Sequence, residues 1–429
     1  MSYGSGREHT LLYQNEGTFG TVPAGWASGI TFLAIDPQMG AMTRAVIPNE
    51  NYKQRIFATR PMVQSLANGE MSFAVYLHGR STAVPDDARA TITSPDFPQA
   101  HFMQNAWGGI RLGYRTLIAS GTATAPVVEA GDGAQYEAGD WMFIHDTGTD
   151  ATRGYFRKIA SVSTDTLTMW LGHDIPFTPA ANDVLGAVIQ AYPHHRRMVN
   201  QAHASHLTQS FLHFGELAED VQQGAGVKLN LTAIEGLEAG GAGRMAFSGM
   251  VAQVVKEGLT APTAADPLGD APLAVATGDD TLVYISAVGA TLATVEAQSI
   301  TVTPGIASQP VPQIGGVEGR SGYTIAADSS DSTMIEVVVD FDSDWSIGFI
   351  AGTRYQILIQ VGTVAGRAYG IFAANCELME DPSRGEATDL ATSVLKFRCL
   401  ESAVSTAATG ETLEKVRAKI EILWSCALS

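Results

Sequence analysis

The chain has 429 residues and a formal net charge of −18, and only 16% of its residues are charged while 45% are hydrophobic. The acidic balance argues against tight wrapping of nucleic acid, which needs Lys and Arg to displace phosphate counterions. No apolar run approaches a membrane span and the N-terminus lacks a signal-peptide pattern, so we expect a protein made soluble inside a cell. The low charge density suggests a surface partly hidden in an assembly.

Nearly every element that the periodicity predicts is a strand. One helix is predicted from about Ser94 to Trp107, because its apolar residues share one face and Gly108 follows it. The predicted strands are rich in β-branched and aromatic residues and mostly alternate apolar with polar positions. In chain order they are residues 70–78, 226–233, 334–341, 354–361, 393–400 and 415–424.

Two shifts in composition divide the chain. Short strands separated by Gly, Asp and Pro turns fill residues 116–192 and suit a small β-barrel inserted into a host domain. These strands are residues 140–144, 154–159, 166–170 and 183–190. A stretch rich in Ala, Pro and Gly then indicates a linker. We therefore predict a first domain (1–115 with 193–257), an inserted domain (116–192), a linker (258–284) and a second domain (285–429).

A weak internal repeat connects the two main domains. Gly215–Asp220 reads GELAED and Cys376–Asp381 reads CELMED, and an alternating strand follows each copy. This order favours a duplicated β domain, and two unrelated hairpins are the alternative. The acidity is uneven as well, because residues 1–257 carry a net charge of −6 and residues 258–429 carry −12.

No motif of catalysis or cofactor binding stands out. Histidines crowd residues 194–213 without metal-ligand spacing, and we interpret them as surface and turn residues. Asp340, Asp342 and Asp344 alternate and should share one face of a strand, which favours a solvated acidic strand end over a Ca²⁺ site. The chain is therefore not expected to be an enzyme or to bind a cofactor or metal. The three cysteines are widely spaced, which predicts buried thiols: Cys376, Cys399 and Cys426.

The opening of the chain resembles a known family. Glu16–Pro23 reads EGTFGTVP and leads into a strand at 32–35, which resembles the start of the major tail tube proteins of long-tailed, siphovirus-type bacteriophages. The resemblance continues through a long polar excursion at 42–68, the strand that follows it, one helix and the strand at 226–231. It covers most of residues 10–257 apart from the insertion, and residues 285–429 less clearly.

The resemblance implies a mainly β fold. Tandem tail-tube-like β-sandwich domains would each contribute strands to an inner β-barrel, with one flanking helix and an inserted small β-barrel. It also implies a structural virion protein, assembled in the bacterial cytoplasm, whose stacked rings form the tail tube for DNA ejection. Closure into rings removes open sheet edges, and an acidic wall lets DNA pass without specific binding. The implied partners are copies of this chain and the tape measure, terminator and distal tail proteins.

Two tube domains in one chain affect the expected symmetry. Rings of the family commonly have six tube domains, so three copies would suffice, and we favour a trimer with pseudo-sixfold symmetry over a hexamer. The insertion is expected on the outside of the tube. Candidate inter-ring contacts lie in the basic excursion of residues 44–68, with a possible counterpart at 304–323. The candidates are Arg44, Tyr52, Lys53, Arg55 and Arg60.

Other classes of function remain open at this point. The chain could be a β-sandwich binding module or distal tail component that recognises a host glycan through the insertion. Trp141, Tyr155 and Trp170 are the candidate stacking residues, although aromatic residues in a small barrel are more often core. A polysaccharide-degrading enzyme would need two carboxylates that face a groove, and the sequence offers no such pair.

Overall fold

The computed structural model describes most of residues 10–428, and strands make up 61% of it and helices 7%. This confirms the prediction of a mainly β fold. The residues outside the described part are 1–9, 22, 24, 27–28, 33, 41–42, 48–62, 93–96, 148–149, 194–206, 215–220, 256–277, 279, 318–319, 326–332, 341, 343, 383, 388–389, 403–417 and 429.

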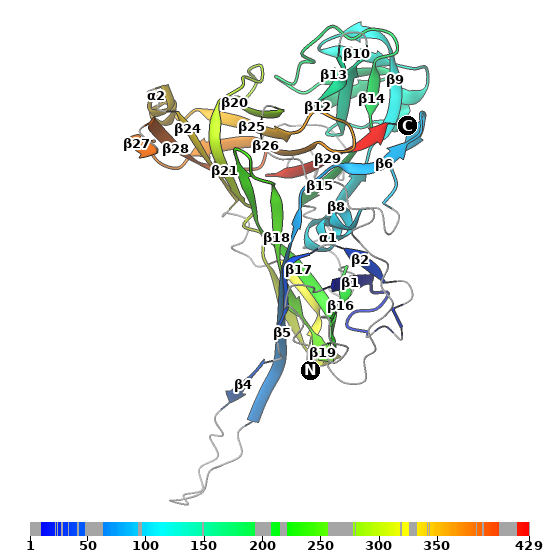
Figure 1. The fold of residues 1–429 in the computed structure, drawn as a ribbon, viewed down its shortest axis with the longest axis vertical. Coiled ribbons are helices and arrows are strands. Elements are labelled where there is room, and N and C mark those ends of the chain that lie inside the picture. Colours follow the sequence, from blue (N-terminus) through cyan, green and yellow to red (C-terminus); the bar gives the residue numbers. More distant parts are fainter. Residues whose placement is uncertain are drawn as a thin grey trace, which may run out of the picture.

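Strands from the first half of the chain build the lower part of the molecule in Figure 1. They are β1 (Thr10–Asn15), β2 (Ile30–Phe32), β3 (Ile35–Met39), β4 (Thr43–Ile47), β5 (Val63–Tyr76), β16 (Gln209–Phe214), β17 (Val221–Glu238), β18 (Arg244–Val251) and β19 (Gln253–Val255). The long strand β17 pairs antiparallel with β16 and with β18. β1 lies beyond β16, and β5 lies beyond β18.

The upper part of the molecule is a sheet that comes mainly from the second half. Its strands are β6 (Arg80–Val84), β8 (Gly108–Leu112), β15 (Val188–Pro193), β20 (Thr281–Ala287), β21 (Ala297–Thr303), β24 (Met334–Asp340), β25 (Arg354–Val361), β26 (Tyr369–Leu378), β27 (Arg384–Ala387), β28 (Leu390–Cys399) and β29 (Glu421–Leu428). The far end of β17 pairs with β21, so one strand belongs to both parts. From β21 the pairing runs through β24 and β28 to β26. β26 also pairs with β25 and with β29.

A small closed barrel lies at one end of the upper sheet (Figure 1). Its strands are β9 (Tyr114–Thr122), β10 (Ala125–Val128), β11 (Trp141–Asp146), β12 (Asp150–Ser163), β13 (Thr166–Met169) and β14 (Val184–Gly186), with the short strand β7 (Ala88–Arg89) beside β9 and a 3₁₀ turn, η1 (Asp132–Gln135), before β11. The order β9, β10, β13, β12, β11, β14 returns to β9, so the six strands form a complete circle of pairs. This is the inserted small β-barrel that the sequence predicts. β15, which follows it, pairs with β8 and β29 outside the barrel.

The predicted helix is α1 (Pro98–Trp107), and its C-terminus is the one expected. Gly108 takes the left-handed φ of 77° and donates its backbone N–H to the carbonyl of Gln104, which ends the helix as a glycine cap. The predicted cap at Ser94 lies outside the described residues. Asn105 fixes α1 on β17, because its side-chain oxygen accepts the N–H of Leu229 at 2.8 Å and its amide donates to the Val227 carbonyl at 3.1 Å.

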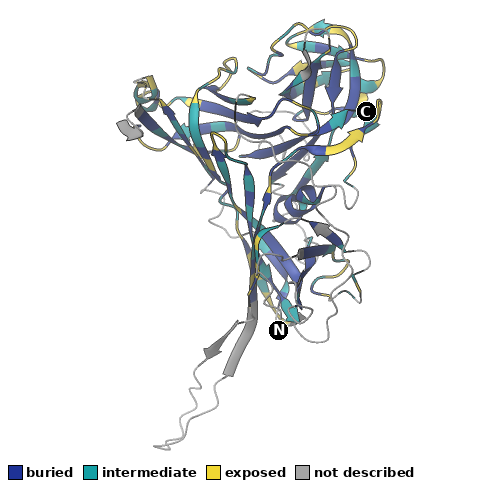
Figure 2. Cartoon of the chain, viewed as in Figure 1, coloured by how far each residue is buried: buried dark blue, intermediate teal, exposed yellow. Residues whose placement is uncertain are grey.

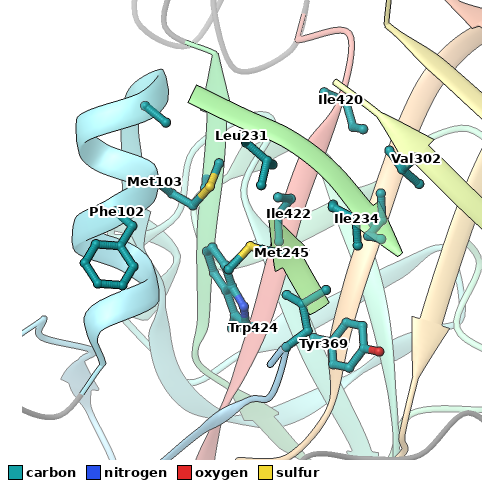
Figure 3. Close-up of a cluster of buried hydrophobic side chains, with 14 of the residues drawn as sticks. Phe102, Met103, Leu231, Ile234, Met245, Val302, Tyr369, Ile420, Ile422 and Trp424 are labelled. Carbon is teal, nitrogen blue, oxygen red and sulfur yellow. The ribbon is translucent and has the colours of Figure 1, made fainter. Parts of the chain in front are cut away.

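One hydrophobic core joins the two halves of the chain. Figure 3 shows Phe102 and Met103 of α1 on the same cluster as Leu231 of β17 and as Ile422 and Trp424 of β29. Buried residues continue from β17 and β18 into the upper sheet (Figure 2). The halves therefore cannot separate without exposing this core to water.

The second half contains a helix that the sequence pattern does not predict. β24 ends at Asp340, and α2 (Asp344–Ile350) begins at the third carboxylate of the expected row. The three Asp residues therefore do not share a strand face, which corrects the prediction. The side chain of Asp342 instead accepts the backbone N–H of Asp344 at 3.0 Å, as a residue just before a helix commonly does.

The three cysteines are free and buried, as predicted. Cys376 and Cys399 face each other across β26 and β28, with their sulfur atoms 3.7 Å apart. Burial raises the pKa of the Cys376 thiol well above its ordinary value, so this thiol stays protonated at neutral pH.

Candidate assembly surface

A β-hairpin arm projects from the lower end of the molecule. The second part of β5 pairs with β18 along Gly69–Tyr76, whereas its first part pairs with β4, from Asn68 opposite Thr43 to Val63 opposite Ile47. Figure 1 shows this arm extending beyond the rest of the fold. Because one continuous strand belongs to both the core and the arm, the direction in which the arm leaves the body is set by the core.

The arm lies in the excursion that the sequence singles out. Arg44 is in β4, where the structure describes the backbone. The other four candidates lie outside the described residues: Tyr52, Lys53, Arg55 and Arg60. Their roles in contacts between rings stay predictions.

The second half contributes a hairpin of its own. β22 (Ser308–Val317) and β23 (Arg320–Ile325) form a separate two-stranded sheet at the predicted counterpart, residues 304–323. Ile314 in β22 is fully exposed. Both excursions that the sequence singles out thus contain a pair of antiparallel strands, β4 with β5 and β22 with β23.

Tyr323 ties the second hairpin to the first half. Its hydroxyl donates to the carbonyl of Gly226 at 2.7 Å and lies 3.1 Å from the carbonyl of Met250, and its side chain is fully buried. Burial raises the pKa of Tyr323 to about 12. Met250 is paired with Glu70 of β5 at the base of the arm. Tyr323 of the second hairpin and the base of the arm therefore lie next to the same stretch of β18.

Glu16 of the opening motif contacts the same region, at the start of β17 beside the second hairpin. Glu16 accepts backbone N–H groups from Gly226 at 2.6 Å and from Gly20 at 3.0 Å, and hydroxyl groups from Ser210 at 2.6 Å and Thr208 at 2.7 Å. A carboxylate with two oxygens can accept four such bonds, and here it links the first turn to β16 and β17.

Close packing explains the other residues of the motif. The ring of Phe19 meets the ring of Tyr323 edge to face at 5.6 Å. Gly20 and Gly226 both have a left-handed φ of 65°, and a Cβ on Gly226 would come within 2.6 Å of the Ala252 side chain. The motif is thus a structural junction between the N-terminal turn, β17 and the second hairpin.

A second exposed feature lies at α2, far from the arm in Figure 1. Ile347 is 63% exposed and Ile350 is 81% exposed, while Trp345 and Phe349 pack against the core. Exposed Asp342 and Asp344 lie beside them. These residues form a small exposed apolar patch next to acidic groups. The sequence predicts a strand end here and therefore does not predict the patch.

The candidate glycan-stacking residues do not form a platform. Trp141 and Trp170 are buried, at 2% and 5% exposure, so a sugar ring cannot reach them in this conformation. Tyr155 is half-buried, and the guanidinium groups of Arg153 and Arg157 lie near its ring. Alternating apolar residues in the sequence do not show whether these aromatic side chains face solvent or the interior. In the structure, the upper sheet covers the side of the barrel that carries Trp141.

Most of the histidines in residues 194–213 lie outside the described part of the chain. His213 lies in β16 and is mostly buried, and His194, His195, His203 and His206 lie outside the described residues. Within the described part of the chain, the only acidic or histidine group close enough to share a metal ion is Asp87, Glu129 and Asp132. The sequence did not single it out, because Asp87 precedes the barrel and Glu129 follows β10.

Comparisons with known proteins provide no identification. A scan against protein-family models and a search of curated protein sequences found no match. Among the residues that the structure describes, no helix has the length and apolar character needed to cross a membrane.

Proposed function

We propose that this chain is a structural virion protein of a long-tailed bacteriophage, whose stacked rings form the tail tube through which DNA is ejected. The observation that carries the proposal is the pair of hairpins, one from each half, that both adjoin the same stretch of β18. A projecting hairpin on a rigid β body suits contacts with a neighbouring copy, since its edges offer unpaired backbone groups.

The charge distribution supports the same proposal. Residues 48–62, between β4 and β5 in the sequence, contain Lys53, Arg55 and Arg60 against the single acidic residue Glu50, in a chain with a net charge of −18. A basic segment in an acidic chain favours head-to-tail contacts between copies and disfavours contacts between two like surfaces. Acidic walls would let DNA slide through the lumen without adhering.

The presence of one hairpin in each half favours a duplicated tube domain. Three copies would then make a ring with pseudo-sixfold symmetry, and a hexameric ring is the alternative. The barrel is proposed to lie on the outside of the tube. Tape measure, terminator and distal tail proteins are the further proposed partners. Electron micrographs of tubes formed by purified protein test this, because strict sixfold symmetry or a barrel inside the lumen would contradict it.

Deletion of residues 49–62 is the sharpest test of the arm. We expect a folded protomer with an unchanged unfolding midpoint that no longer forms tubes in negative-stain images, because the removed residues are not among the paired positions of β4 and β5. A matched control replaces Arg244 and Lys396, which take part in exposed ion pairs elsewhere, with Gln. The control should still form tubes, since such pairs contribute little. Normal tubes from the deletion would refute the assignment of the arm.

A further inference from the structure

The barrel and the upper sheet meet in an apolar seam. Trp141, Phe143 and Phe156 of the barrel pack with Phe372 of β26 and Leu423 of β29. Gln360 of β25 binds the barrel backbone as well: its oxygen accepts the N–H of Phe156 at 3.0 Å and its amide donates to the carbonyl of Gly154 at 2.9 Å. The inserted barrel is therefore fixed on the opposite half of the chain.

One amine and one carboxyl group are enclosed in this seam. Lys158 of β12 and Glu421 of β29 are both fully buried, and the Lys158 amine contacts Oε1 of Glu421. Lys158 lies directly opposite Trp141 in the barrel, and Glu421 lies directly opposite Phe372 in the upper sheet. The amine is 4.8 Å from the ring centres of Trp170 and Phe372. Aromatic rings thus surround the pair.

The two oxygens of Glu421 have different surroundings. Oε1 faces the amine, while Oε2 accepts the indole N–H of Trp141 at 2.5 Å and the side-chain amide of Gln190 at 2.8 Å. Two N–H donors fixed on one oxygen are the arrangement that stabilises negative charge when a nucleophile adds to a carboxyl carbon. The donors come from β11 and β15, so the fold holds them in place before any reaction.

Burial also favours the uncharged forms of both groups. Removal from water raises the pKa of Glu421, and the neighbouring Lys158 opposes that shift. A buried Lys likewise favours its neutral amine, which is the nucleophilic form. The ring of His173 packs on Trp141 and Phe372, and burial keeps its pKa well below the ordinary value, so it brings no charge to the seam.

We propose that Lys158 and Glu421 join in an intramolecular isopeptide bond that covalently links the barrel to the last strand of the chain. The neutral amine attacks the carboxyl carbon of Glu421, and the negative charge that develops on Oε2 is held by Trp141 and Gln190. The nitrogen passes one of its two protons to Oε1, which already carries the carboxyl proton, the bond from carbon to Oε1 breaks and one water molecule leaves, while the amide nitrogen keeps its second proton. No oxidant, reductant or co-reactant is needed, and the product is a neutral amide in an apolar site.

Mass spectrometry of the purified full-length chain tests the bond. We expect a tryptic digest to contain one branched peptide that joins the segments around Lys158 and Glu421, lighter by one water than the sum of the two. The linked chain should also migrate faster on a denaturing gel, since the bond closes a loop between residues 263 positions apart. Recovery of both segments as separate peptides from folded protein would overturn the proposal.

Two variants distinguish a covalent bond between Lys158 and Glu421 from noncovalent packing of the same two residues. Lys158→Arg should give the unlinked mass, because a guanidinium does not lose its proton. Lys158→Met with Glu421→Met removes both reacting groups, and this double variant should fold without the link, since apolar replacement of a whole buried pair is tolerated. A branched peptide at this position in either variant would contradict the assignment.

Trp141→Phe addresses the oxyanion role while keeping an aromatic ring in place. The linked fraction, measured at intervals after a short pulse of synthesis, should rise more slowly by on the order of 10²-fold, as for the loss of one oxyanion donor. Equal rates in Trp141→Phe and the unmodified chain would overturn the role assigned to the indole N–H.

Discussion

The two hairpins that leave the core differ in how they are held. The second hairpin, β22 with β23, is bound to the first half by the buried hydroxyl of Tyr323 and by the ring of Phe19. The described part of the arm, β4 with the start of β5, continues from the core through one strand. The two excursions thus differ, because the second hairpin is supported inside the protomer whereas the described part of the arm extends beyond the rest of the fold.

This difference suggests a division of labour. A hairpin whose polar groups are satisfied inside the protomer contributes to folding stability, whereas an arm whose partners lie elsewhere contributes to assembly. Changes in the anchor of the second hairpin should therefore reduce stability, and changes in the arm should reduce tube formation at constant stability. The predictions below concern the anchor, from the largest expected effect to the smallest.

Tyr323→Ala should have the largest effect. It removes a fully buried ring, its contact with Phe19 and its bond to the carbonyl of Gly226. We expect a loss of about 3–5 kcal/mol in the free energy of unfolding, as for large-to-small changes of buried aromatic residues. Urea unfolding followed by tryptophan fluorescence measures it. A loss below about 1 kcal/mol would mean that the hairpin is not anchored here.

Glu16→Gln should have an intermediate effect. The amide keeps one acceptor oxygen but turns two N–H donors toward a site where Glu16 now accepts bonds from Gly20, Gly226 and two hydroxyl groups. We expect a loss of about 1–3 kcal/mol in the free energy of unfolding, from unsatisfied backbone groups. Glu129→Gln, on an exposed residue, is the control and should change stability by less than about 0.5 kcal/mol.

The sequence predicted much of the fold because local signals agree with tertiary structure there. β25 occupies Arg354–Val361, the predicted range, because its apolar run is flanked by turn residues. α1 ends at Trp107 as predicted, because Gly108 can take the left-handed conformation. The strand that begins at residue 334 is also predicted correctly. The sequence does not predict α2, because three carboxylates at alternate positions are compatible with a strand and equally with a turn that leads into a helix.

The candidate sites were harder to predict for a physical reason. Lys158 and Glu421 are 263 residues apart, and the sequence has no periodic pattern that relates them. Tyr323 reads as an ordinary strand residue until its hydroxyl is seen on the carbonyl of Gly226. Long-range polar pairs depend on how the elements pack, whereas strand and helix signals are local.

Tyr323→Phe should have the smallest effect at neutral pH and a distinctive dependence on pH. The variant keeps the ring against Phe19 but loses the hydroxyl, so we expect a loss of about 1 kcal/mol in the free energy of unfolding near pH 8.

The pKa of Tyr323 is raised to about 12 by burial, from an ordinary value of 10.0. Between these values the unfolded chain releases the proton and the folded protein keeps it. The stability that the hydroxyl contributes is therefore complete below pH 10 and falls as the pH rises toward 12, by about 1.4 kcal/mol per pH unit. Urea unfolding of both proteins at pH 8, 10 and 11 measures the difference, and other buried tyrosines cancel because both proteins contain them. The variant should become the more stable of the two at the highest pH. A difference that stays constant across this range would show that the Tyr323 hydroxyl ionises as freely in the folded protein as in the unfolded chain, and would contradict the buried anchor.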